Sequence, residues 1–305
     1  MYKFYEYFQK VTVPLGYAMA VVGLVFLFQW DSIVKLWVFL FVCIVTILIA
    51  GILSYIDISQ ERKKHNYIAD NTSIAQSLKD AMEIWYSDEK YGEVITFGKA
   101  LGRALYISAC YQTRIEVGEL VKNAAEHRND KILTVKVLLD DLGWTKFLCG
   151  DISAKDDINA AIEIATDIKY YWGICKGYRH LLAIEISIWN NPNEAHELLK
   201  KAYSAYDKID AGREKEIVLA GLIYAEAELA FKEHDYALAR NKAIESQKKR
   251  NELNETDRNM RCYAQLGKIE LIDPQGEIEK AKDYFRKGID ESERIDRVDE
   301  IVKNT

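Results

Sequence analysis

The chain contains few residues that interrupt regular secondary structure. It has only 3 prolines and 16 glycines among 305 residues. Because proline breaks helices and glycine favours turns, this shortage argues against an architecture of many short strands and tight turns. Hydrophobic residues make up 49% of the chain and charged residues 29%, which excludes collagen-like and low-complexity compositions. We therefore expect a folded, all-α protein.

Closely spaced cysteines are also absent. The chain has five cysteines, Cys43, Cys110, Cys149, Cys175 and Cys262. No two of them have the spacing of a zinc site or of a redox-active Cys-x-x-Cys motif. We therefore expect reduced cysteines buried in the core, in a protein whose soluble part lies in a reducing compartment.

The sequence has no excess of positive charge and no recognisable catalytic motif. Its formal net charge is -6 at pH 7, whereas the phosphates of nucleic acids call for a basic face. The histidines are scattered, and there is no nucleophile elbow, phosphate-binding loop or metal-ligand motif. Asp140 and Asp141 are adjacent, so a regular helix would point them to different sides and prevent joint acid–base catalysis. We expect no enzyme, no cofactor, no metal site and no nucleic-acid partner.

Two long apolar runs lie near the start of the chain, at residues 11–28 and 36–56. Each run is about long enough to cross a hydrocarbon layer of roughly 30 Å as a helix. A secretory signal peptide is the alternative for the first run, but the second run follows within a few residues and no cleavage site precedes a mature domain. The pattern predicts a membrane anchor at 1–58 with two transmembrane helices, at 11–30 and 33–56.

Positive charge flanks both runs on one side of the membrane. Two lysines precede the first run, and the basic stretch Arg62–Lys64 follows the second within a charged neck at 59–72. By the positive-inside rule, both termini are predicted to be cytoplasmic and the short link between the spans external. This prediction places residues 73–305 on the cytoplasmic side of an inner or plasma membrane.

Small residues recur on one face of the first predicted span, at Gly16, Ala20 and Gly23. Small side chains at this spacing let two helices approach closely. They would pack either on the second span of the same hairpin or on a second copy of the chain, and the motif does not choose between the two. Neither run contains an internal acid or base, which argues against a dedicated transporter or selective channel.

Beyond residue 73, apolar residues recur at three- and four-residue spacing, which is typical of amphipathic helices. Breaks in this pattern fall at Gly150, Asn190, His234 and Gly276, separated by 40, 44 and 42 residues. A nearly fixed period of this size indicates a solenoid of stacked helix pairs.

The residues around these breaks resemble the tetratricopeptide repeat (TPR) family. Leu142-Gly143 precedes Gly150-Asp151 in the order that the family shows, and the chain also looks like the TPR-like sensor regions of bacterial signalling ATPases. The resemblance implies a TPR-like α-solenoid of about five to six helix pairs at 73–305. The family's small-residue positions correspond to Gly143, Ala183 and Ala227 before the turns, and to Ala195, Ala239, Ala281, Ala202, Ser246 and Gly288 after them.

In this family, the first helix of each pair lines the concave face. The resemblance therefore implies a partner-binding groove formed by Asp140, Trp144, Phe147, His180, Tyr224, Glu228, Phe231 and Lys232. A groove with aromatic anchors and mixed charge suits a peptide or protein segment. The alternative is that the aromatic residues are ordinary core between repeats. The basic cluster Lys248–Arg250 is expected to be a solvated helix end.

Taken together, these features predict a membrane-anchored scaffold or adaptor that binds a protein or peptide partner on its concave face. The alternative function is a membrane-disrupting effector, as in bacterial anti-phage defence. In that case the solenoid would sense a partner or ligand and cluster the transmembrane hairpins, and the chain would form homo-oligomers through its spans.

The predicted topology can be tested by labelling with a membrane-impermeant thiol reagent in intact cells. A cysteine introduced at Ser32, in the external link, should gain label relative to the parent chain, whereas one introduced at Ser73 should not. The reverse pattern would contradict the cytoplasmic placement of the repeats.

Overall fold

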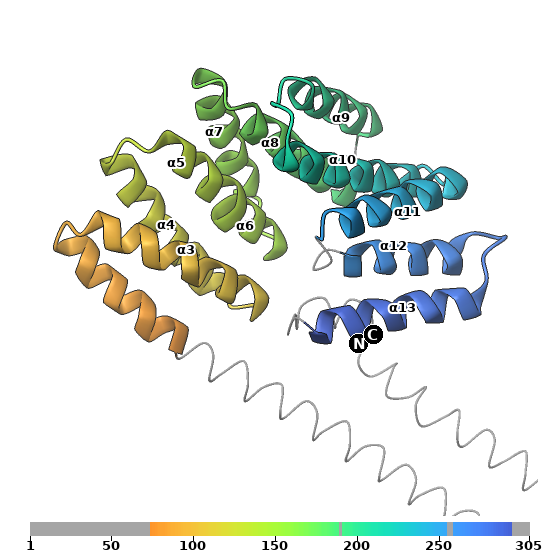
Figure 1. Ribbon diagram of the computed structural model, residues 1–305, viewed down its shortest axis with the longest axis horizontal. Coiled ribbons are helices and arrows are strands. Elements are labelled where there is room, and N and C mark those ends of the chain that lie inside the picture. The colour runs from red at the N-terminus through yellow and green to blue at the C-terminus, as the bar shows by residue number, and fades with distance from the viewer. Residues whose placement is uncertain (1–73, 189–190, 255–258, 295–305) are drawn as a thin grey trace, which may run out of the picture. The chain divides into compact units, whose positions relative to one another are not determined.

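The structure is a computed structural model that describes residues 74–188, 191–254 and 259–294. All regular secondary structure in these ranges is helical, as the sequence predicted. Residues 74–87 form a helix, and the elements labelled in Figure 1 follow it: α3 (Tyr91–Ile107), α4 (Tyr111–His127), α5 (Lys131–Val137), the π-helix η1 (Leu138–Gly143), α6 (Trp144–Leu148), α7 (Ala154–Asp167), α8 (Tyr171–Ile188), α9 (Pro192–Tyr206), α10 (Arg213–Lys232), α11 (Tyr236–Glu252), α12 (Asn259–Ile272) and α13 (Ile278–Arg294).

The chain divides into two compact units, residues 1–69 and 70–305. All described residues belong to the second unit. The predicted membrane anchor, with Gly16, Ala20 and Gly23, lies outside the described residues. Within the described ranges, no helix combines the length and the apolar character needed to cross a membrane.

Helices that are adjacent in the sequence pack against each other as pairs (Figure 1). The segments α5, η1 and α6 continue without a turn and form one rod, which packs on α7. Before the rod, α3 packs on α4. After α7, the pairs are α8 with α9, α10 with α11, and α12 with α13. From the rod onward, the first helix of each pair ends next to a predicted break, at Leu148, Ile188, Lys232 and Ile272. This arrangement is compatible with a helical-repeat solenoid.

Local backbone chemistry explains where several helices begin. Asn129 adopts a left-handed conformation with φ of 54°, and the next residue, Asp130, accepts a hydrogen bond from the backbone N–H of Leu133 at 3.0 Å. His234 and Asp235 repeat this arrangement, with φ of 65° and a hydrogen bond of 2.9 Å to the next helix. Asparagine and histidine are among the non-glycine residues that adopt this conformation most readily, and aspartate is a preferred helix N-cap.

The turns at Ala109 and Lys169 lie where the sequence predicted no break. Ala109 separates α3 from α4 with φ of 58°, and Lys169 separates α7 from α8 with φ of 56°. Neither residue type favours a left-handed backbone, and no glycine or proline marks either turn. These turns are therefore determined by the packing of the helices on either side.

All but one of the small residues predicted at the repeat positions are buried between packed helices, the exception being Ala183, which is partly buried. Ala195, Ala239 and Ala281 are completely buried, as are Ala202 and Ser246. The Ser246 hydroxyl also donates a 2.7 Å hydrogen bond to the carbonyl oxygen of Ala220 on α10. Because methyl-sized side chains fill these contacts, the helices approach more closely than larger residues would permit.

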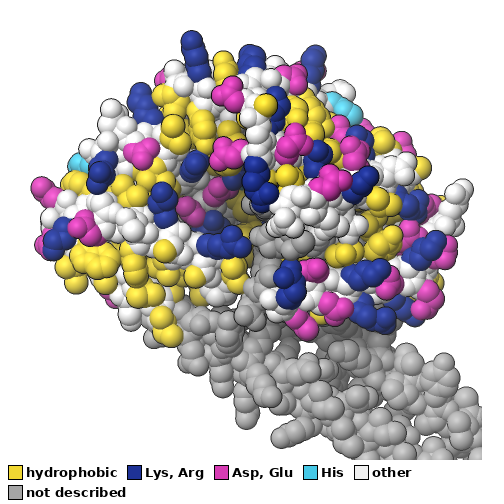
Figure 2. Space-filling view, viewed as in Figure 1, with side chains coloured by type: hydrophobic (Ala, Val, Ile, Leu, Met, Phe, Trp, Pro, Cys, Tyr) yellow, Lys and Arg dark blue, Asp and Glu magenta, His cyan; other side chains and the backbone are white. Residues whose placement is uncertain are grey.

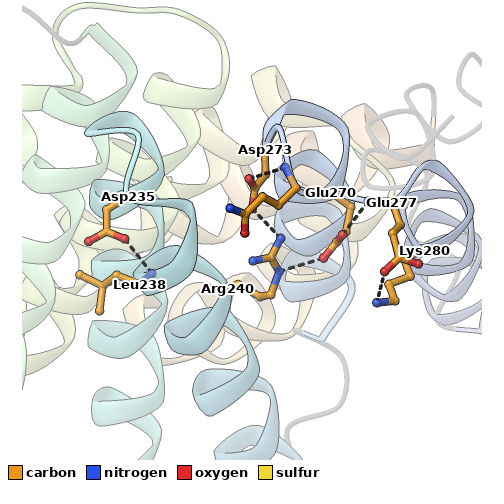
Figure 3. A network of polar contacts seen from close by, with 8 residues as sticks. Asp235, Leu238, Arg240, Glu270, Asp273, Glu277 and Lys280 are labelled. Carbon is orange, nitrogen blue, oxygen red and sulfur yellow. Dashed lines mark hydrogen bonds and ion pairs between the residues drawn. The ribbon is translucent and has the colours of Figure 1, made fainter.

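An ion-pair cluster joins α11 to the last pair (Figure 3). Arg240 on α11 donates from Nε to Glu270 at 2.9 Å and from Nη2 to Asp273 at 2.8 Å. The second oxygen of Glu270, Oε2, accepts the backbone N–H of Glu277 at 3.0 Å. Since Glu270 is only 6% exposed, Arg240 supplies the positive charge that its buried carboxylate requires.

The cysteines match the prediction in part. Cys110, Cys175 and Cys262 are buried and Cys149 is exposed, and all four are free thiols. The prediction of burial was wrong for Cys149 because this residue follows α6 at the turn into α7. Cys43 lies outside the described residues.

The close approach at Gly143 predicts a large cost for any bulky residue there. A Cβ atom at this position would lie 2.6 Å from Ile158 Cγ1 and 3.0 Å from the carbonyl oxygen of Leu138. Gly143→Leu should therefore lower the free energy of unfolding by about 1–3 kcal/mol or more. Thermal melts of the full chain in detergent, followed by circular dichroism, measure this change.

The matched control is Lys248→Ala, which alters an exposed side chain on α11 and should change the stability by less than about 0.5 kcal/mol. Equal melting temperatures for the two variants would contradict the assigned packing.

Candidate functional site: a basic cavity

A cavity of about 440 Å³ is bordered by residues from α3 in the first part of the domain to α12 near its end. Figure 2 shows a hollow in the described surface with basic and acidic side chains at its edge. Among the described residues, the lining includes two carboxylates, Asp140 and Asp141. It includes eight basic side chains: Lys99, Arg103, Arg114, Lys136, Lys176, Arg179, Arg250 and Arg261. In a chain of net charge -6, this is a strong local excess of positive charge.

The π-helix η1 places both aspartates at the cavity. The hydroxyl of Thr145 donates to the carbonyl oxygen of Asp140, five residues earlier, at 3.2 Å. Both aspartates border the cavity, although they are adjacent in the sequence. Each contacts a different helix, since Asp140 pairs with Lys176 of α8 and Asp141 with Arg114 of α4. Short π-helical segments are frequent at functional sites.

Arg114 holds α4 against η1. Its Nε and Nη2 donate to Asp141 Oδ1 at 3.1 and 2.8 Å, and its Nη1 donates to the hydroxyl of Thr145 at 3.0 Å. The guanidinium carbon also lies 4.6 Å from the centre of the Tyr106 ring on α3. Arg114 is 7% exposed, so these contacts compensate the cost of burying its charge.

Asp140 is held as a carboxylate by its partner. Burial acts to raise the pKa of Asp140, but the Lys176 ammonium at 2.6 Å and the nearby Arg114 outweigh that effect and lower the pKa to about 2. Lys176 Nζ also lies 4.4 Å from the centre of the Trp172 ring. The Asp140–Lys176 pair therefore fixes η1 to α8 at one wall of the cavity.

His180 is a buried residue of the cavity wall with an unsatisfied nitrogen. It is 4% exposed, and its ring centre lies 4.8 Å from that of Trp144. Its Nε2 lies 3.2 Å from Nη2 of Arg179. Because a guanidinium can only donate, Nε2 accepts and a neutral imidazole carries its hydrogen on Nδ1. Among the described residues, Nδ1 has no hydrogen-bond partner.

The electrostatic surroundings keep this imidazole neutral. Burial lowers the pKa of His180, and the positive charge of Arg179 lowers it further, to well below the usual value of 6.5. Asp140 opposes the shift but does not reverse it. The cavity wall therefore presents an uncharged N–H donor at a position shielded from water.

Residues that are far apart in the sequence meet at the cavity. Arg261 on α12 donates from Nη2 to the hydroxyl of Tyr106 on α3 at 2.6 Å, and its guanidinium carbon lies 5.6 Å from the centre of the Trp144 ring. Arg250 on α11 is 5% exposed and donates from Nε to Ser246 at 3.2 Å. The expectation of a solvated helix end was therefore wrong for Arg250.

The structure brings together some of the residues that the sequence predicted for a partner-binding groove. Asp140, Trp144, His180 and Tyr224 line the cavity. Glu228 lies beside them, where burial raises its pKa and the positive charge of Arg261, with Tyr224 as hydrogen-bond partner, opposes that rise.

Four predicted groove residues do not line the cavity, namely Glu228 and three others. Phe147 packs on Trp144 with ring centres 5.2 Å apart, and Phe231 packs on Tyr236 at 5.8 Å. Lys232 lies at the last position of α10. Sequence reasoning predicted none of the eight basic residues as part of a site, because they come from six different helices that are spread over most of the domain.

No protein-family model matches the chain. A search of curated proteins likewise finds none with significant similarity. Among the described residues, no group of three or more His, Cys, Asp or Glu side chains is arranged to hold a metal ion. The fold and the site together define an all-α protein of consecutive helix pairs with a basic cavity.

The depressed pKa of His180 predicts how stability depends on pH. In the unfolded chain this histidine takes up a proton near pH 6.5, whereas in the folded chain it resists protonation. The unfolded state therefore binds more protons, and the stability should fall as the pH drops below about 6.5. Thermal melts of the full chain between about pH 7.5 and 5.5 should show this loss, and His180→Asn should remove part of it.

The control for this measurement is His234→Asn. It replaces an exposed histidine with a residue that tolerates the same left-handed backbone, and it should retain the loss. An identical pH dependence in the parent chain and His180→Asn would contradict the assignment.

Proposed function

We propose that this chain is a non-enzymatic, membrane-anchored, TPR-like scaffold whose repeat domain binds a partner through the basic cavity. The partner presents negative charge to that cavity. The single observation that carries this proposal is the convergence of eight basic and two acidic side chains on one cavity. Residues 11–56 supply the membrane attachment, and the cavity faces the cytoplasm.

The cost of bringing like charges together supports an anionic partner. Basic side chains that share a cavity repel one another, and this repulsion destabilises the folded state unless counter-charge is present. Among the described residues, the lining holds eight basic side chains against two aspartates, with Glu228 nearby, so positive charge outnumbers negative charge at the cavity. An anion bound in the cavity would relieve this repulsion, so that charge complementarity favours its binding.

The small-residue register supports the assignment to TPR-like repeats. Ala195, Ala239 and Ala281 occupy the same place in three successive pairs and are all completely buried. A solenoid of this kind presents the first helix of each pair to its concave face, and the cavity residues Trp144, His180 and Tyr224 come from α6, α8 and α10.

A membrane-disrupting effector is the second candidate function. One observation favours it, namely that the cavity is bordered by both early and late helices of the repeat domain and includes the contact between Arg261 and Tyr106. A ligand bound there would touch segments 155 residues apart in the sequence and could change their spacing. In the effector, that change would cluster the hairpins through Gly16, Ala20 and Gly23.

Binding of simple polyanions to the full chain in detergent tests the proposed function. The probes are inorganic triphosphate and a fluorescent peptide of ten glutamates. A peptide of ten lysines, which carries the opposite charge, is the negative control. At least one polyanion should bind. Its affinity should fall steeply between about 0.1 and 1 M salt, where the screening length falls from about 10 to 3 Å. The double variant Lys99→Glu/Arg103→Glu should abolish this binding.

Both substituted side chains are exposed, so the fold should survive the change. The matched control is Lys248→Glu, which reverses an exposed charge outside the cavity and should leave binding intact. The proposal fails if neither polyanion binds, or if the control variant loses binding as strongly as the double variant. Dye entry into cells that express the full chain, abolished by Ala20→Leu, would favour the effector over the scaffold.

A further inference from the structure

We propose that the cavity binds a nucleotide that carries two or more phosphate groups, with guanidinium groups on the phosphates and the buried Nδ1–H of His180 as a further donor. This inference rests on the proposed function, because it assigns a ligand class to the same cavity. It excludes an acidic peptide segment as the group that the cavity recognises.

The composition of the basic lining favours phosphate. Five of the eight basic residues are arginines: Arg103, Arg114, Arg179, Arg250 and Arg261. The planar guanidinium matches the oxygens of a phosphate through two parallel hydrogen bonds, whereas lysine acts as a point charge. In a nucleoside di- or triphosphate the terminal phosphate carries nearly two negative charges near neutral pH and each internal phosphate carries one, so the ligand brings about three to four negative charges to the basic lining.

The size of the cavity favours a small molecule over a polypeptide. Its volume of about 440 Å³ lies within the range of small-molecule sites, roughly 300–1,000 Å³. His180 adds an N–H donor that is buried, neutral and without a partner in the described structure. A buried donor that stays unsatisfied costs free energy. Nδ1 has almost no accessible surface, so a ligand oxygen would remove this cost only if neighbouring side chains move to admit it.

The other side chains of the lining favour an organic group next to the phosphates. Tyr106, Trp144 and Tyr224 provide aromatic surface at the cavity. Asp140 and Asp141 are hydrogen-bond acceptors that would repel a ligand of purely negative charge but accept hydrogens from hydroxyl or amino groups. A nucleotide combines anionic phosphates with the hydroxyl and amino donors of its sugar and base. Inorganic polyphosphate and polyglutamate side chains lack such donors.

Titration calorimetry on the full chain in detergent tests this inference with ATP, GTP, CTP and UTP as probes, each measured separately. At least one should bind more than tenfold tighter than its own monophosphate, inorganic triphosphate and the peptide of ten glutamates. Arg179→Gln should weaken that binding by about tenfold or more, since a hydrogen bond to a charged group contributes about 1.5–3 kcal/mol. His180→Phe, which keeps an aromatic ring but removes the donor, should also weaken it.

Lys248→Gln is the control, because it removes a nearby exposed charge of α11 that does not line the cavity. If His180→Phe does not unfold cooperatively, the exposed pair Lys99→Gln/Arg103→Gln takes its place and should weaken binding by a similar factor. Tight binding of triphosphate or polyglutamate without preference for any nucleotide would overturn this inference and leave the proposed function standing. No binding of any of these anions would overturn both.

Discussion

The close approach of successive helices is the constraint on which the rest of the domain depends. Gly143, Ala195, Ala202, Ala239 and Ala281 leave room for neighbouring helices where a larger side chain would meet backbone or core atoms. Each repeat contacts mainly its neighbours, so the geometry of one pair is transmitted to the next through these contacts. The direction of each helix, and with it the position of every side chain at the cavity, therefore follows from the size of a few buried residues.

The charge that lines the cavity is mainly positive, whereas the whole chain has a net negative charge. A net charge of -6 over 305 residues conceals a site where basic side chains from six helices meet. Two of these, Arg114 and Lys176, are bound to the aspartates of η1 and so take part in joining α4, η1 and α8. These two ion pairs hold the helices of the cavity wall together, and they reduce the net positive charge of that wall. Replacing either aspartate would therefore change both the packing of the helices and the electrostatic potential of the cavity.

The sequence was sufficient to predict features that repeat along the chain. It was insufficient to predict the cavity, where side chains from distant parts of the sequence meet. The helical class, the breaks after Leu148, Ile188, Lys232 and Ile272, and the burial of small residues all follow from spacing along the chain. Trp144, His180 and Tyr224 could be placed on one face for the same reason. The basic residues could not, because they lie on both helices of different pairs and meet only after the pairs stack. The turns at Ala109 and Lys169 carry no local signal either.

Because Tyr106 and Arg261 are in contact, the shape of the cavity depends on every helix pair that lies between them in the sequence. These residues are 155 positions apart, and their hydrogen bond of 2.6 Å is reached only if the turns and packing angles of all intervening pairs add up correctly. A small rotation at any one pair would separate the two side chains and widen the cavity. Conversely, a ligand that touches both early and late helices stabilises one set of packing angles over the others. Binding at such a site is thus coupled to the packing angles of all the helix pairs that lie between α3 and α12.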